Sequence, residues 1–456
     1  GEAMMACHGD DILVQGPGAI HDEVEHMLRA NADVKILGRI GPGHGKIGKF
    51  LKRAIEWDEE SKDFTWSADP AHVGAAAEAL GMTGRNQCKG SATPCSSALS
   101  GSDEKLNDQE HRLFRSVAGI VSYTALDRPD IQYSVKCVMN EVAAPTEQSM
   151  NRLRRIVRYL IRHPVLKWRF PRQPMVKYVD AFGDSDWAGE HGEVHKRRST
   201  TCVVERVGAH VVETVSVTQH TISLSSAEAE LYASNRAAAG GLQTKHFMLE
   251  SGYAVQLRVW SDSSASRGII RRTGTGKVKH IELRWLWVQE ALRERRFLLK
   301  TVRTDDNPSD VGTKYLSEAR LALLLDILGM LRSKQESVCA VAMLSCFPLV
   351  HGHGEDDDDG VSWLWSASIW AYHVLVVMAL SLLVRWWLLE KSTVVEKVDV
   401  GTQTVEPAAV PYPVELYLQR YLAPDLRDMC RARGLPVGGL RDDIVCRIVL
   451  SPVRSE

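Results

Sequence analysis

The stretch FGDSDWAG, residues 182–189, places two carboxylates, Asp184 and Asp186, directly after an apolar run. The overlapping stretch MVKYVDAF, residues 175–182, has the composition of a β-strand. Both acids are therefore expected at the end of a strand. The segments on the C-terminal side of this strand decide which fold it belongs to.

Residues 175–325 alternate strand and helix signals in the order βββαβαβα. Gly208 marks the turn between the second and third strands, and Ser225 and Ser226 are cap candidates for a long Ala-rich helix that reaches about Glu250. The last helix is expected from about Pro308. The five expected strands are MVKYVDAF, TTCVVERV, HVVETVSV, QLRVWSD and RFLLKTV. The order predicts an α/β fold, a mixed five-stranded sheet with flanking helices.

Acidic residues from four distant segments of this region fall at strand ends or helix starts. Acids that converge repel one another unless cations neutralise them. Two divalent cations about 4 Å apart would do so, and would clamp a phosphodiester during an in-line displacement. All-oxygen ligands suit Mg²⁺, with Mn²⁺ as the alternative. Four acids in a region of this length are common by composition alone. The candidates are Asp184, Glu230, Asp262 and Asp310.

Glu228 and Glu230 lie on the same predicted helix, and a spacing of two residues separates them by about 200° around its axis. Only one of them can face the site. We expect it to be Glu230, because its neighbours three and four positions away are small and let the helix lie close to the sheet. Glu228 is then expected to be solvated or a secondary acid. The small neighbours are Ser226, Ala227, Ala233 and Ser234.

Six motifs, in order, resemble the ribonuclease H domain of copia-type retrotransposon polyproteins. They are FGDSDWAG (182–189), RRST (197–200), SVTQHTISLSSAEAELYA (216–233), WSDSSAS (260–266), KVKHIELRWLWVQE (277–290) and NPSDVGTKYL (307–316). The resemblance implies a ribonuclease H-like domain over 173–330, which hydrolyses the RNA strand of RNA–DNA hybrids with two Mg²⁺ ions. It maps the catalytic and metal-binding acids onto Asp184, Glu230, Asp262 and Asp310. Its motifs also imply nucleic-acid contacts at Arg198, Ser199 and Gln219.

The sequence departs from the family pattern at three places. Thr201 and Cys202 stand where the family has Gly after its R-S-T, Ser263 stands for the Asn after the third acid, and Tyr315 stands for Pro after Lys314. None of these changes removes one of the four acids. They fit a diverged copy of the family.

The resemblance extends toward the N-terminus. Residues 111–164 resemble the connection between polymerase and ribonuclease H, and HGDDILV at 8–14 resembles the Y-V-D-D metal-binding turn of the reverse transcriptase palm. This implies a truncated palm and thumb over 1–100, a helical connection over 101–172, and a vestigial polymerase metal site at Asp10 and Asp11. We therefore expect no polymerisation by this chain alone, and a separate polypeptide that carries the missing polymerase half as a partner.

The stretch MNRLRRIVRYLIRHP, residues 150–164, predicts a helix with one apolar face. Arginines fill most of the remaining surface, and two interpretations stay open. They form a solvated face on a core helix, or Arg152, Arg155 and Arg158 lie along a phosphate backbone. The apolar face consists of Leu153, Ile156, Val157 and Leu160.

The C-terminal part has a different texture. After a linker with an acidic run (331–360), residues 361–384 carry no charged side chain and are long enough to span a bilayer. They predict a single transmembrane helix over 361–388, with a buried apolar helix as the alternative. A second linker (389–413) precedes residues 414–452, which resemble a DNA-binding SAP motif that includes Arg441. The alternative for this module is a helical hairpin that binds another partner.

The whole chain of 456 residues has a formal net charge of −1 and nine scattered cysteines without a C-x-x-C pair. A basic nucleic-acid-binding surface must therefore be local, and the cysteines indicate free thiols in a reducing compartment. Two functions remain open. The first is a ribonuclease H, cytoplasmic or nuclear unless the apolar span anchors it in a membrane. The second is a catalytically inactive, membrane-tethered nucleic-acid-binding descendant.

Overall fold

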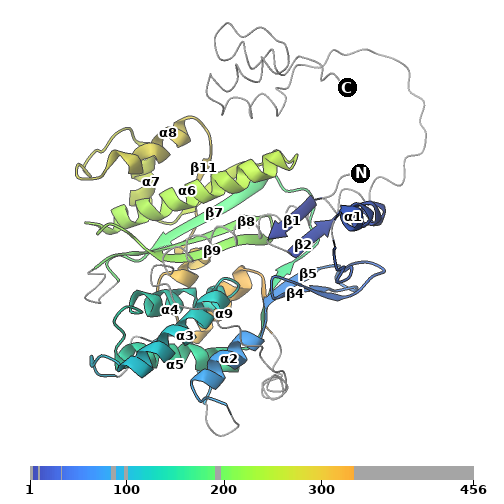
Figure 1. Ribbon diagram of the computed structural model, residues 1–456. Coiled ribbons are helices and arrows are strands. Elements are labelled where there is room, and N and C mark those ends of the chain that lie inside the picture. Colours follow the sequence, from blue (N-terminus) through green and yellow to red (C-terminus); the bar gives the residue numbers. More distant parts are fainter. Residues whose placement is uncertain are drawn as a thin grey trace, which may run out of the picture. The chain divides into compact units, whose positions relative to one another are not determined.

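The computed structural model describes residues 4–8, 11–31, 33–83, 89–96, 101–189 and 197–332 (Figure 1). Asp10, Arg441, the predicted transmembrane segment 361–384 and the predicted SAP-like module 414–452 lie outside these residues. Within the described ranges, no helix is both long enough and apolar enough to cross a membrane.

The five strands expected over 175–302 form one mixed sheet, which confirms that prediction. They are β7 (Tyr178–Ser185), β8 (Thr200–Val207), β9 (His210–Thr218), β10 (Gln256–Ser261) and β11 (Leu298–Thr301), and their order in the sheet is β11-β10-β7-β8-β9. β10 runs parallel to both β7 and β11, whereas β7, β8 and β9 pair antiparallel. Gly208 turns the chain between β8 and β9 with a positive φ of 64°, as expected for a tight hairpin.

One face of this sheet is covered by α6 (Ser226–Glu250), which contacts β7, β8 and β10 (Figure 1). Ser225 caps the helix by accepting a hydrogen bond from the backbone N–H of Glu228, as predicted. The approach is close at Gly241, where an added Cβ would lie 2.5 Å from Leu257 Cδ1 and 3.0 Å from the Cβ of Ala181. After β10 follow α7 (Ser264–Arg271), the 3₁₀ turn η1 (Leu283–Leu286) and α8 (Trp287–Arg293).

The opposite face carries the 3₁₀ turn η3 (Pro308–Gly312), not the α-helix that was predicted from about Pro308. Glu205 faces α6, because it accepts a hydrogen bond from Thr244, so Cys202 points to the other side of β8. The chain passes close to β8 here, because at Gly312 an added Cβ would lie 2.6 Å from Cys202 Sγ. The α-helix α9 (Glu318–Ile327) begins only after a new cap at Ser317.

The predicted helical connection consists of α3 (Asp108–Ala125), α4 (Pro129–Asn140) and α5 (Glu147–Arg162). The apolar face predicted for α5 is fully buried, which confirms the periodicity. α4 lies against the sheet: Gln132 Nε2 donates to Thr214 O at 3.0 Å, and Lys136 Nζ donates to Thr200 Oγ1 at 2.7 Å. The buried residues of the α5 face are Leu153, Ile156, Val157 and Leu160.

A second sheet contains β3 (Ile47–Phe50), β4 (Arg53–Trp57), β5 (Phe64–Ala68), β6 (Leu166–Phe170) and β12 (Met330–Arg332). Its order is β12-β6-β5-β4-β3, and every pairing is antiparallel. The sheet therefore contains strands from all three segments that were predicted as separate domains, 1–100, 101–172 and 173–330. The boundaries of these domains stay predictions. The remaining described elements are the hairpin of β1 (Met4–His8) and β2 (Asp11–Gln15), the helices α1 (Gly18–Asn31) and α2 (Ala71–Ala79), and the 3₁₀ turn η2 (Thr304–Asp306).

Candidate metal centre

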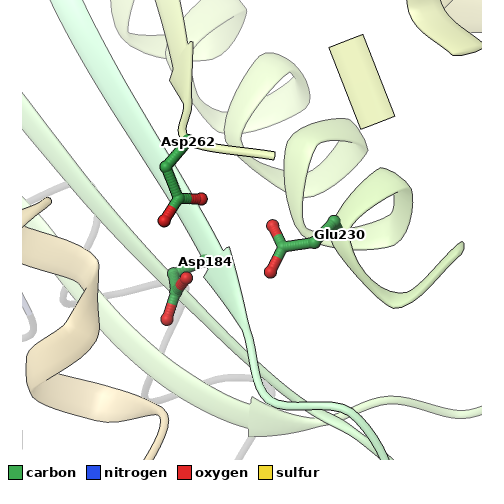
Figure 2. A group of neighbouring side chains, drawn as sticks. All are labelled: Asp184, Glu230 and Asp262. Carbon is green, nitrogen blue, oxygen red and sulfur yellow. The ribbon is translucent and has the colours of Figure 1, made fainter. Parts of the chain in front are cut away.

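Three of the four predicted acids converge at one end of the first sheet. Asp184 comes from the end of β7, Asp262 follows β10, and Glu230 lies in the first turns of α6 (Figure 2). One carboxylate oxygen from each lies within 4.8 Å of the others. Asp184 and Asp262 meet because β7 and β10 are parallel neighbours, whose carboxyl ends share one edge of the sheet.

Burial makes this cluster electrostatically unusual. Asp184 and Glu230 are 6% and 8% exposed. Burial, reinforced by the negative charges of Asp310 and Asp262, raises the pKa of Asp184 to about 7. Burial and the charges of Asp184 and Asp262 raise the pKa of Glu230 to about 9. Glu230 Oε2 is buried and receives no hydrogen bond from the described residues. A buried carboxylate oxygen without a partner, among like charges, fits a cation ligand.

Hydrogen bonds fix the orientation of each of the three acids. Thr313 Oγ1 donates to Asp184 Oδ2 at 2.7 Å, and Thr304 Oγ1 donates to Asp262 Oδ2 at 2.9 Å. The backbone N–H of Ser185 donates to Glu230 Oε1 at 3.1 Å. None of these donors was predicted from the sequence. Thr313 lies in the motif NPSDVGTKYL, so its position was visible there, although its partner was not.

Asp310 lies beside this cluster but is not one of its three ligand residues. Its side chain is buried, and each of its oxygens meets a cation: Lys314 Nζ lies 2.7 Å from Oδ1, and Arg320 Nη2 lies 2.9 Å from Oδ2. Asp310 nevertheless acts on the cluster through its charge, which contributes to the raised pKa of Asp184. The described residues thus hold three converging carboxylates and a fourth that is ion-paired.

Glu230, and not Glu228, joins the cluster, in agreement with the helix geometry. Of the two alternatives expected for Glu228, a solvated or a secondary acid, the first is wrong, because Glu228 is only 2% exposed. Its carboxylate accepts hydrogen bonds from Tyr232 Oη at 2.6 Å and from the backbone N–H of Leu224 at 2.9 Å, and it lies 2.8 Å from His280 Nε2. Burial alone would raise the pKa of Glu228, but these hydrogen bonds outweigh it and lower the pKa.

Ser199 and Gln219, which were predicted to contact nucleic acid, are 0% and 7% exposed. Ser199 Oγ accepts from the backbone N–H of Ala188 at 3.1 Å. Gln219 Nε2 donates to Thr201 Oγ1 and to the backbone carbonyl of Ala229, both at 2.9 Å. These two side chains are buried and join the loop after β7, the ends of β8 and β9, and the start of α6. Their contact with nucleic acid stays a prediction.

The four arginines that were predicted to contact nucleic acid differ in whether they bond to other side chains of the protein. Arg152 pairs with Glu141 and donates to Gln148, and Arg155 donates to Thr93 Oγ1 at 2.9 Å. Arg158 is exposed and Arg198 is half-buried. These positions favour the interpretation of α5 as a core helix whose arginines stabilise the connection, with Arg158 left to solvent.

Asp11, the described member of the predicted polymerase site, is exposed at the start of β2. Among the residues that the structure describes, Asp11 belongs to no group of three metal-ligating side chains. A polymerase site at Asp10 and Asp11 therefore stays a prediction.

Comparison with known proteins finds relatives among retrotransposon Pol polyproteins and one mitochondrial protein. An uncharacterized mitochondrial protein of Arabidopsis thaliana is 32% identical over 155 residues, which cover 34% of this chain and 63% of that protein. The Pol polyprotein from transposon TNT 1-94 of Nicotiana tabacum is 23% identical over 333 residues, 70% of this chain and 24% of the polyprotein. The Pol polyprotein from transposon RE1 of Arabidopsis thaliana is 25% identical over 234 residues, 51% of this chain and 16% of the polyprotein.

No family model matches the chain, and no solved structure matches it. The relatives show that the chain is a retroelement-derived protein, homologous to retrotransposon Pol polyproteins. It spans 63% of the mitochondrial protein and a quarter or less of the tobacco polyprotein and of the RE1 polyprotein.

Proposed function

We propose that this protein is a metal-dependent ribonuclease H that cleaves the RNA strand of RNA–DNA hybrids. The observation that carries the proposal is the cluster of Asp184, Glu230 and Asp262, whose oxygens lie within 4.8 Å of one another. Homology to Pol polyproteins and the six motifs of residues 182–316 support it. The cluster by itself would suit any phosphodiester, so the choice of a hybrid rests on the motifs.

The residues present fit a divalent cation, with Mg²⁺ as the expected ion and Mn²⁺ as the alternative. Bound Mg²⁺ would supply charge stabilisation for an in-line attack of water on the phosphorus. Asp184, Glu230 and Asp262 would hold it, and Thr313 and Thr304 keep two of these carboxylates in a fixed orientation. Because the pKa values of Asp184 and Glu230 are raised, both carboxyls would release protons when they bind a cation.

The proposal is tested with a hybrid whose RNA strand carries a fluorophore, incubated with the full chain and Mg²⁺. We expect cleavage of the RNA strand in the hybrid, and none of an RNA duplex or a DNA duplex. Asp184→Asn should lose about a thousandfold in rate, since several kcal/mol of charge stabilisation depend on the ion. Asp305→Asn removes an exposed acid of the neighbouring turn η2 (Thr304–Asp306) and should keep full activity. Absence of cleavage by the wild-type chain would sink the enzyme proposal.

A second candidate is a protein that binds hybrids without cleaving them. It is favoured by one observation, the pairing of both Asp310 oxygens with Lys314 and Arg320, because a carboxylate neutralised in this way is a poor ligand for a second metal ion. Hybrid binding without cleavage in the same assay would support it. Three separate proposals concern features that the described residues do not address. They are DNA binding through the SAP-like module, membrane insertion of 361–384, and a partner polypeptide that carries a polymerase.

A further inference from the structure

Three exposed apolar side chains lie in the loops that flank the metal centre. Trp187 is 54% exposed, Ile222 53% and Leu224 65%. Trp187 comes three residues after Asp184, so their Cα atoms are at most about 11 Å apart. Gathered apolar side chains with this exposure mark an interaction site. We call these three residues the Trp187 surface.

A chain of hydrogen bonds connects the Trp187 surface to the protein interior. Trp187 Nε1 donates to the backbone carbonyl of Ser223 at 3.0 Å, and Ser223 Oγ donates to Gln219 Oε1 at 2.9 Å. Gln219 in turn donates to the backbone carbonyl of Ala229 in α6. The indole is therefore held by a hydrogen bond while Trp187 stays 54% exposed. An aromatic side chain that is already fixed loses little conformational entropy when a ligand packs on it.

Exposed cations lie in a loop next to the same surface. The backbone N–H of Leu224 and the ring of His280 both meet Glu228 Oε2, at 2.9 and 2.8 Å, so the loop that carries His280 lies beside the Trp187 surface. Lys277 and Lys279 of this loop are exposed, and neither has an ion-pair partner in the described part of the chain. Apolar contact and free positive charge thus occur together, next to the carboxylate cluster.

We propose that the Trp187 surface packs against sugars in the minor groove of the bound hybrid, beside the phosphate held at the metal centre, and that Lys277 and Lys279 contact its backbone. This inference rests on the proposed function for the choice of ligand. The minor groove of an A-like duplex is wide and shallow and displays the sugars, whereas its paired bases are stacked and offer no free face. An apolar surface that is bordered by cations suits the sugars and phosphates of such a strand.

Hybrid binding by the full chain is measured by fluorescence anisotropy without divalent cations, so that no turnover occurs. Trp187→Ala should weaken binding about fivefold or more, as expected when a large apolar side chain that packs on the sugars is truncated. Trp187→Phe, which keeps an aromatic ring but loses the bond to Ser223, should retain most of the affinity. Leu249→Ala is the control. Leu249 is a comparably exposed apolar residue, at 48%, but it lies near the far end of α6, about 28 Å along the helix from Glu230 and the metal centre.

Salt dependence separates the two kinds of contact. The double variant Lys277→Ala, Lys279→Ala should make the plot of log Kd against log salt shallower by roughly 1 to 2. Trp187→Ala should leave this slope unchanged, because it removes no charge. Thermal melting of each variant shows that the chain is still folded.

Three outcomes would overturn the inference: no hybrid binding by the wild-type chain, an unchanged Kd for Trp187→Ala, or an equal loss in Trp187→Phe. The last result would mean that only the bond to Ser223 matters. The proposed function fails separately. If binding depends on Trp187 but Mg²⁺ produces no cleavage, the Trp187 surface is supported and the ribonuclease H proposal is rejected. If the chain cleaves the hybrid but binding does not depend on Trp187, the ribonuclease H proposal is supported and the Trp187 surface is rejected.

Discussion

Asp184 and Glu230 bring carboxylate oxygens within 4.8 Å of each other from two different elements, a strand end and the first turns of a helix. Burial and mutual repulsion raise the pKa of Asp184 to about 7 and that of Glu230 to about 9. Without a cation, the folded protein therefore binds protons at this site that the unfolded chain has already released. Because of this difference in bound protons, both the pH and the binding of a metal ion should change the stability of the folded protein.

The first prediction concerns stability against pH in the absence of divalent cations. Both carboxyls have a higher pKa in the folded than in the unfolded chain, so the folded state binds more protons between about pH 4 and 9. Stability must then fall as pH rises through this window. We expect the melting temperature of the metal-free chain to be lower at pH 8.5 than at pH 6, and Mg²⁺ to restore more of it at pH 8.5. A variant with Asp184→Asn and Glu230→Gln should show a flatter profile; an equally steep decline in that variant would contradict the assignment.

The second prediction concerns Glu230→Gln. The change removes one ligand charge, so it should weaken metal binding and abolish cleavage. Because the pKa of Glu230 is about 9, the folded wild type keeps this carboxyl largely protonated at pH 8.5, although the unfolded chain has released the proton, and this costs stability. Gln is neutral in both states, so the metal-free variant should melt at a higher temperature than the wild type at pH 8.5. Titration with Mn²⁺ and thermal melting measure the two effects. Lower stability together with normal metal binding would show that Glu230 has a purely structural role.

The third prediction concerns Glu228, which lies two residues away but in a different environment. Glu228→Ala leaves the hydroxyl of Tyr232 and the backbone N–H of Leu224 without their acceptor. We expect a loss of about 1–3 kcal/mol in the free energy of unfolding, from unsatisfied buried groups. Mn²⁺ affinity should stay at the wild-type value, since Glu228 is outside the cluster. Glu290→Ala, at an exposed position of α8, is the control and should change neither quantity. Weaker Mn²⁺ binding by Glu228→Ala would place this residue in the metal site.

Patterns within one segment were sufficient to predict much of the sheet. TTCVVERV matches β8 from its first to its last residue, and Ser225 caps α6 where the cap was expected. Alternation and capping are local properties, so they can be recognised without the rest of the fold. The meeting of Asp184 and Asp262 also followed from position, because both acids stand at the ends of their strands.

Features that depend on contacts between distant segments were not predictable in the same way. The burial of Glu228 depends on His280, which approaches from a loop after α7. The pairing of Asp310 depends on Arg320 in α9, so four equivalent acids in the sequence become three converging acids and one ion-paired acid. The close passage of Gly312 over β8 likewise joins distant segments, and no local pattern reveals it.

The last prediction compares two glycines in helices. At Gly241 in α6, an added Cβ would lie 2.5 Å from Leu257 Cδ1 and 3.0 Å from the Cβ of Ala181. Gly241→Ala should therefore push α6 away from the sheet and cost about 1–3 kcal/mol, as overpacking does. At Gly119 in α3, an added Cβ would meet nothing within 4 Å. Gly119→Ala should therefore stabilise the protein by about 0.5–1 kcal/mol, through the helix propensity of alanine.

Thermal melting and the urea midpoint of each glycine variant measure these opposite changes, and Mn²⁺ titration gives a second readout. α6 carries Glu230, so Gly241→Ala should also weaken Mn²⁺ binding, whereas Gly119→Ala should leave it unchanged. Destabilisation by both substitutions would mean that the close contact at Gly241 is not the cause of its effect. Normal Mn²⁺ affinity in a destabilised Gly241→Ala variant would show that the first turns of α6 keep their position independently of the contact at Gly241.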